Sequence, residues 1–131
     1  MKKTTTFGLI VVFLISLSFP ISSYAEVKQQ TVTHVVLVWL KKPGNKAMRQ
    51  QFISISKQLN DLPGIMYRHV GEVMASERQV VDDTFDVAVT ATFKNKKALQ
   101  AYLDHPRHKE IIHQKLKPMI NRVVIYDFAG Q

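Results

Sequence analysis

The 131-residue sequence contains no cysteine, so disulfide bonds are excluded as a source of stability. Small exported domains often depend on disulfides, because a short chain buries proportionally less of its surface. This chain must instead be stabilised by its hydrophobic core, or by a core that a partner subunit extends. The same absence excludes a lipid-modified N-terminal cysteine.

The first 25 residues also lack any acidic residue and any apolar run long enough to span a membrane. Lys2 and Lys3 precede an uncharged, apolar run of 13 residues, 7–19, whereas a membrane-spanning helix needs about 20. Ser23-Tyr24-Ala25 then forms a small-x-small site that is typical of signal-peptide cleavage. The pattern predicts a cleaved signal peptide, and an uncleaved membrane anchor is the alternative.

The predicted organisation is a signal peptide over residues 1–25, a flexible lead-in over 26–31 and one domain over 32–131. Such a protein would be exported to the periplasm or secreted. After cleavage we expect no contact with a membrane.

The basic residues are not grouped as they are on a nucleic-acid-binding surface. The formal net charge is +8, or +6 without Lys2 and Lys3. The other lysines stand mostly at the edges of predicted elements, at 41–42, 94 and 96–97, without interleaved aromatic residues. A nucleic-acid face needs clustered Arg and Lys beside stacking rings, so we expect no nucleic-acid partner.

Four segments have the pattern of strands: 32–40, 65–74, 85–93 and 122–128. In the third, strict alternation assigns Phe85 and Val87 to one face and Asp86 to the other. The first and last segments are apolar on both faces. On the first, one face carries His34, Val36, Val38 and Leu40, and the other carries Val35, Leu37 and Trp39.

Apolar residues spaced by three and four predict a helix over 46–60, capped by Asn45. Asn95 begins a shorter helix with Leu99, Tyr102 and Leu103 on its apolar side. Pro106 suits the first turn of another helix, which runs to about Lys117.

The resulting order is strand, helix, strand, strand, helix pair, strand, which is the β-α-β-β-α-β pattern of the α+β, ferredoxin-like fold. The fold class predicts a four-stranded antiparallel sheet with helices on one face. The first strand is apolar on both faces, and the helices can cover only one of them. A second copy packing sheet against sheet would cover the other face. We therefore predict a homodimer through Val35, Leu37 and Trp39.

Several segments resemble the stress-responsive A/B barrel domain (Dabb) family over about 34–128. They are Thr33-His34-Val35-Val36-Leu37-Val38, Leu62-Pro63-Gly64-Ile65, Phe85-Asp86 through Phe93, Tyr102-x-x-His105-Pro106-x-His108 and Val124-Ile125-Tyr126-Asp127.

The resemblance implies a dimeric α+β barrel. In a plant polyketide cyclase of this family, the tyrosine and the second histidine of the Tyr-x-x-His-Pro-x-His block form an acid-base pair that needs no cofactor. Carried over by motif, those roles fall on Tyr102 and His108, and a pocket-lining strand histidine falls on His34. Where that cyclase has a further pocket histidine on the third strand, this chain has Val87, which makes the pocket more apolar.

The residues themselves leave the role of this block open. His108 lies three and four residues before Ile111 and Ile112, hence on the inward face of its helix, where an imidazole could act as a general base. It could equally be a core histidine bonded to a backbone carbonyl or to Tyr102. Tyr102 could donate to a substrate carbonyl, or cap the core.

A metal site is not expected. It would need three imidazoles converging on one ion, and His108 and His113 are five residues apart, which does not place them on one face of an α-helix.

We predict that the protein binds a small hydrophobic or aromatic ligand between sheet and helices, without a metal or cofactor and in an undefined stress-related role. The expected ligand-binding residues are His34, Val36, Val87, Val89, Leu99 and Ile112. The alternative is a cofactor-independent acid-base enzyme, a cyclase, aldolase or lyase, with His108 as base and Tyr102 as oxyanion donor.

Overall fold

The computed structural model describes residues 30–130, so the predicted signal peptide lies outside the described residues. The described part contains four strands and three α-helices. They are β1 (Val32–Leu40), α1 (Lys46–Lys57), β2 (Ile65–Glu72), β3 (Val87–Phe93), α2 (Lys96–Asp104), α3 (Pro106–Glu110) and β4 (Ile120–Ala129).

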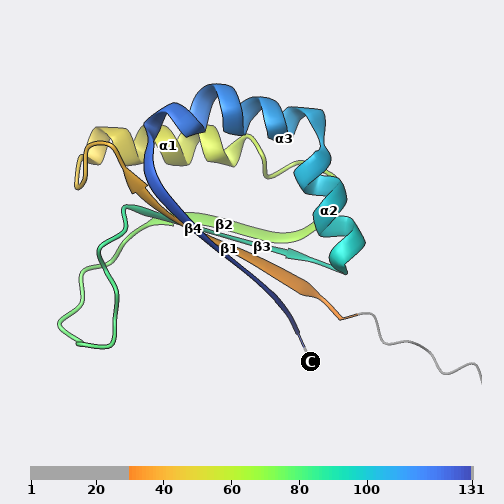
Figure 1. The fold of residues 1–131 in the computed structure, drawn as a ribbon, viewed down its shortest axis with the longest axis horizontal. Coiled ribbons are helices and arrows are strands. Elements are labelled where there is room, and N and C mark those ends of the chain that lie inside the picture. Colours follow the sequence, from red (N-terminus) through yellow and green to blue (C-terminus); the bar gives the residue numbers. More distant parts are fainter. Residues whose placement is uncertain (1–29, 131) are drawn as a thin grey trace, which may run out of the picture.

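The four strands form one antiparallel sheet in the order β2-β3-β1-β4. All helices of the described residues lie on the same face of this sheet, and none of them covers the other face (Figure 1). The predicted α+β, ferredoxin-like architecture is therefore confirmed, with the first and last strands adjacent. β4 is an edge strand, so the backbone groups along its outer edge pair with no other strand of the described residues.

Helix α1 begins where the sequence predicts, at Lys46, but it ends earlier than predicted. The side chain of Asn45 accepts a hydrogen bond of 2.9 Å from the backbone N–H of Met48, as a helix N-cap does. The helix ends at Lys57, three residues before the predicted end, and turns lead to Gly64. Gly64 has φ +89°, a left-handed conformation that glycine adopts without steric cost.

Asp86 is the clearest departure from the predicted alternation. β3 begins at Val87, two residues after the predicted start at Phe85, so Phe85 and Asp86 precede the strand. The Asp86 carboxylate is 1% exposed and accepts hydrogen bonds from Leu40 N (2.9 Å), Gly44 N (2.8 Å) and Arg49 Nε (2.9 Å). It therefore ties the end of β1 and the following turn to the first turns of α1.

The helical segment before β4 is not a single α-helix. His105 ends α2 and caps α3, its Nδ1 accepting from the backbone N–H of Arg107 at 3.2 Å. After α3 the chain continues as a π-helix over Ile111–Leu116 and a short 3₁₀ turn over Lys117–Met119. The wider π turn places Ile111 and Leu116, five residues apart, on the same buried side.

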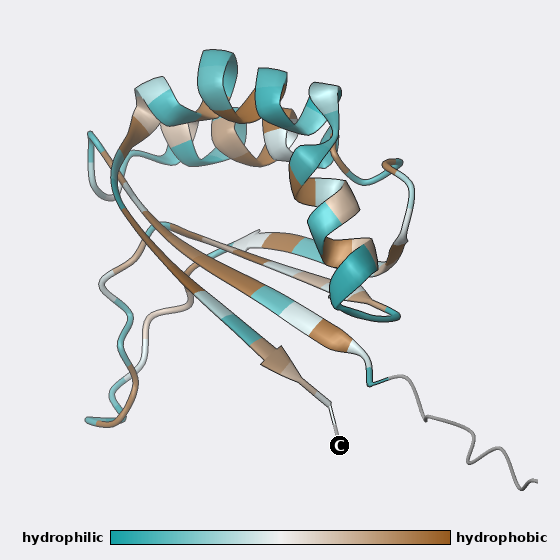
Figure 2. Cartoon of the chain, turned by 45° about the vertical axis from the view of Figure 1, so that its right-hand side comes forward, coloured by the Kyte–Doolittle hydropathy of each residue, from teal (hydrophilic) through white to brown (hydrophobic). Residues whose placement is uncertain are grey.

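The two faces of the sheet differ in cover. Side chains toward the helices form the core, and the helices carry hydrophilic residues on their outward side (Figure 2). The opposite face carries apolar side chains of β1 and β4 with no helix above them. Paired residues there are Val35 with Tyr126 and Leu37 with Val124, and Tyr126 is 58% exposed.

Trp39, which we expected on this outer face, is partly covered by its own chain. Its indole N–H donates to Thr84 Oγ1 at 3.0 Å, and the ring of Phe85 packs edge-on at 6.4 Å between centroids. The guanidinium of Arg122 lies 4.3 Å above the indole, a cation–π contact. Trp39 is therefore fixed at one end of the outer face.

Candidate functional site

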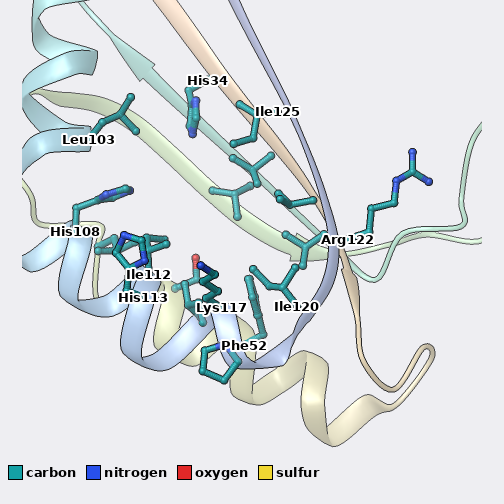
Figure 3. A pocket seen from close by; sticks show the side chains of 18 of the residues that line it. His34, Phe52, Leu103, His108, Ile112, His113, Lys117, Ile120, Arg122 and Ile125 are labelled. Carbon is teal, nitrogen blue, oxygen red and sulfur yellow. The ribbon is translucent and has the colours of Figure 1, made fainter.

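A cavity of about 810 Å³ lies between the inner face of the sheet and the helices. Its walls come from all four strands, from α1 and α2, and from the helical segment before β4 (Figure 3). Two wall residues on β4 remain well exposed, Val123 at 44% and Ile125 at 51%. The cavity is therefore open to solvent along the β4 edge.

His34 enters the cavity from β1 and is 7% exposed. Its Nδ1 lies 2.6 Å from Oδ1 of Asp127, the residue opposite it on β4. Because the two side chains of a paired position lie on the same face of a sheet, β4 holds the orientation of this imidazole. The ring projects into the cavity, toward the space that His108 also faces (Figure 3).

Tyr102 and His108 meet on the helical side of the cavity. The two rings are in contact, with centroids 4.5 Å apart and planes inclined by 59°. Tyr102 is 3% exposed and also packs on Phe93, at 5.1 Å between centroids. The tyrosine is thus both a core residue and a wall of the cavity, so the two alternatives for it are not exclusive.

The environment of His108 favours a neutral imidazole. Burial, reinforced by the positive potential of His34, Arg68 and His113, lowers the pKa of His108 from 6.5 to about 4, and a hydrogen bond to the Leu103 carbonyl opposes the shift. At pH 7 the ring is therefore uncharged. The hydrogen bond from His108 to the Leu103 carbonyl corresponds to the alternative of a core histidine, which the sequence left open.

The hydroxyl of Tyr102 is likewise kept in its neutral form. Burial raises its pKa above the ordinary 10.0, and the nearby guanidinium of Arg68 works in the opposite direction. A neutral phenol remains a hydrogen-bond donor at physiological pH. The helical wall therefore presents a neutral phenol and a neutral imidazole to any occupant.

Six of the eight predicted site residues line the cavity: His34, Val36, Val89, Tyr102, His108 and Ile112. Val87 and Leu99 do not. Val87 is fully buried and Leu99 is 6% exposed, and both pack in the hydrophobic core. Both therefore face inward, as the sequence indicated, but belong to the core and not to the cavity wall.

The sequence reasoning missed His113 and Arg68. His113 lines the cavity together with His108, because the π-helical winding after Glu110 alters the angular spacing that was assumed for an α-helix. Arg68 stands on β2 opposite Ala91, an inward-facing residue of β3. Arg68 is two residues from Val70 and therefore lies on the same face of the strand, which could have revealed it. A charged residue among inward apolar positions, however, is not expected from an apolar pattern.

Within residues 30–130, no group of three or more His, Cys, Asp or Glu side chains is arranged to hold a metal ion. Over the same residues, no helix has the length and apolar character that a membrane crossing requires.

The fold and the cavity define a ferredoxin-like α+β protein with a pocket between its sheet and helices. The model of the stress responsive A/B barrel domain (Dabb) matches residues 32–129, and the chain belongs to this family. A search of curated proteins found no match.

Three solved structures illustrate the range of similar folds. A Dabb family protein with a ferredoxin-like fold from Mesorhizobium loti has a TM-score of 0.66 and 18% identity, covering 79% of this chain and 99% of its own. A hydroxynitrile lyase from Passiflora edulis has a TM-score of 0.66 and 18% identity, and the match covers 79% of this chain and 95% of its own. A dimeric ferredoxin-like protein of unknown function from Thermobifida fusca has a TM-score of 0.60 and 22% identity, and the match covers 79% of this chain and 93% of its own. At these identities the likeness concerns the fold.

Proposed function

We propose that this protein binds a small hydrophobic or aromatic molecule in the cavity between sheet and helices, as an exported homodimer. The observation that carries the proposal is the cavity itself. Its volume of about 810 Å³ falls in the range of small-molecule sites, about 300–1,000 Å³. Val36, Val89, Leu103, Ile112 and Ile125 give it the apolar walls that such sites have.

Filling the cavity tests this proposal. N-phenyl-1-naphthylamine, a neutral aromatic probe whose fluorescence rises in apolar surroundings, should bind the purified protein. Ile112→Trp should lower its affinity by at least about tenfold, because the larger ring occupies the cavity. Lys109→Trp, on the exposed side of α3, is the matched control and should leave the affinity unchanged. Equal binding by both variants would remove the cavity as the binding site.

The proposed dimer packs the bare sheet face against the same face of a second copy. Tyr126 and Phe128 are 58% and 55% exposed, and they pair with Val35 and Thr33 of the neighbouring strand. An apolar surface of this kind is typical of an interface, and the Thermobifida fusca neighbour is described as dimeric.

Leu37→Asp should convert the dimer to a monomer, measured by light scattering on a sizing column. Val80→Asp is the control, because Val80 is 85% exposed but lies in the loop between β2 and β3. A wild-type protein that is monomeric at micromolar concentration contradicts the proposed assembly.

Export rests on the N-terminal pattern. N-terminal sequencing of the protein recovered outside the cytoplasm should begin at Glu26. A chain recovered only with its first residue intact and bound to membranes would support the anchor instead.

A second candidate, an acid-base enzyme, is supported by the grouping of Tyr102, His108 and His34 around one cavity. A hydroxynitrile lyase is among the structural neighbours. In this case His108→Ala would abolish turnover of a found substrate and retain its affinity. In the binding case, the same variant changes affinity alone. The low pKa of His108 favours binding, because a base with a pKa of about 4 accepts a proton poorly at neutral pH.

A further inference from the structure

The charged groups around the cavity are of one sign. Lys41, Arg68 and Lys117 line it, and no Asp or Glu is among the described lining residues. Arg122 also belongs to the wall but projects away from the cavity (Figure 3), toward Trp39. The carboxylate of Asp127 is engaged with the lining residue His34. An apolar cavity with this positive bias favours an anionic occupant over a cationic one.

Arg68 differs from the two lysines because its guanidinium is fixed from behind. Nη1 donates to Ser56 O at 3.0 Å and to Asn60 Oδ1 at 2.7 Å, and Nη2 donates to Ser56 Oγ at 2.8 Å. These partners lie at the end of α1 and just after it. The side chain is therefore held beneath α1, and a ligand would not have to immobilise it.

The hydrogen bonds of Arg68 leave part of its donor capacity unused. A guanidinium carries five N–H donors: the bonds to Ser56 and Asn60 use three, and Arg68 also hydrogen-bonds the Tyr102 side chain. Nε is buried and has no acceptor. A buried donor without an acceptor is unfavourable, so the protein by itself leaves this guanidinium incompletely satisfied.

The groups beside Arg68 suit the same occupant. Arg68 hydrogen-bonds the Tyr102 side chain, and the Tyr102 ring lies 4.5 Å from that of His108 between centroids, so the three side chains are grouped on the wall of the cavity. A neutral phenol can donate to an oxygen acceptor that the guanidinium also binds. The remaining walls, with Val36, Val89 and Ile125, suit a hydrocarbon or aromatic body.

From these contacts we infer that the ligand is an organic carboxylic acid, bound as its carboxylate at Arg68 and Tyr102 with its apolar body toward the β4 edge. This inference rests on the proposed ligand-binding function and specifies its ligand class. The carboxylate provides two acceptor oxygens for the guanidinium and the phenol, while the body occupies the apolar part of the cavity.

The test compares acids with their amides, which have the same skeleton and nearly the same shape but no charge. The probes are 2-naphthoate with 2-naphthamide and octanoate with octanamide, titrated calorimetrically into the purified protein at pH 7.5 and low salt. At least one acid should bind about tenfold or more tightly than its amide, the size expected of a charge-assisted hydrogen bond. Arg68→Met should abolish that preference and leave amide binding within about twofold.

Two further variants separate charge recognition from the structural role of Arg68. Asn60→Ala removes one anchor of the guanidinium and keeps its charge, so the acid preference should persist even if stability falls. Lys97→Met removes an exposed lysine of α2 that does not line the cavity, and should also keep the preference. If Arg68→Met does not fold, Arg68→Lys replaces it, and the preference should then decrease because lysine lacks the planar fork.

The outcomes distinguish this inference from the function on which it rests. Equal binding of acid and amide by the wild type, or a preference that survives at Arg68→Met, overturns the carboxylate assignment and leaves the ligand-binding proposal standing. Failure of all four probes and of N-phenyl-1-naphthylamine overturns both.

Discussion

The low pKa of His108 predicts a specific pH dependence of stability. Burial and the positive charge of its neighbours lower the pKa from 6.5 to about 4 in the folded protein. The unfolded chain therefore binds the proton more readily. Stability from this group is complete above about pH 6.5 and is lost as the pH falls toward 4.

The size of the effect follows from the shift. Between pH 7.5 and 5.0, a lowering of the His108 pKa from 6.5 to about 4 corresponds to a loss of about 2 kcal/mol of unfolding free energy for a fully buried group. The imidazole is partly exposed at the cavity, so solvent screening reduces the expected loss to about 1 kcal/mol. The range stops at pH 5.0 because carboxylates begin to titrate below it.

Urea unfolding followed by circular dichroism measures this difference. Between pH 7.5 and 5.0, the unfolding free energy of the wild type should fall by about 1 kcal/mol more than that of His108→Asn. His69→Asn, at an exposed histidine of β2, is the matched control and should behave like wild type. The pKa can also be read from the His108 ring proton by NMR. A midpoint near 6.5, or equal pH dependence in all three proteins, would refute the buried, cation-surrounded environment inferred for His108.

Three further substitutions test how the scaffold is held. Asp86→Ala should lower the unfolding free energy by about 3–5 kcal/mol, because it leaves Arg49 and the buried N–H of Leu40 without their partner; a loss below about 1 kcal/mol is incompatible with that network. Gly64→Ala should cost about 1 kcal/mol or more in urea unfolding, since φ there is +89°, and an unchanged midpoint would argue against that conformation. Asn45→Ala should cost about 1 kcal/mol through loss of the N-cap of α1; Asn45→Asp keeps a capping oxygen and should retain most of the stability.

The sequence determined the order of the elements. Hydrophobic periodicity depends only on local geometry, two residues per repeat in a strand and 3.6 in a helix. It was therefore sufficient to give the ferredoxin-like order. It could not choose the inward face of the first strand, which is apolar on both faces, and the pocket position of His34 came from the motif resemblance. The motif resemblance added the association of Tyr102 and His108, which lie in contact in the structure.

The tertiary structure decided what local periodicity cannot encode. Whether an inward residue meets a cavity or the core depends on the neighbouring elements, which is why Val87 and Leu99 lie in the core while Val89 and Ile112 line the cavity. The buried carboxylate of Asp86 is stabilised by groups far from it in sequence, at Leu40, Gly44 and Arg49.

The same holds for the polar side of the cavity. Arg68 is tolerated at an inward position because the end of α1 supplies its acceptors, and His113 reaches the cavity because the chain there winds as a π-helix. Such contacts form between segments that meet only on folding. The sequence therefore indicated which side chains face inward, and the packing of α1 and the last helical segment against the sheet decided which of them share a site.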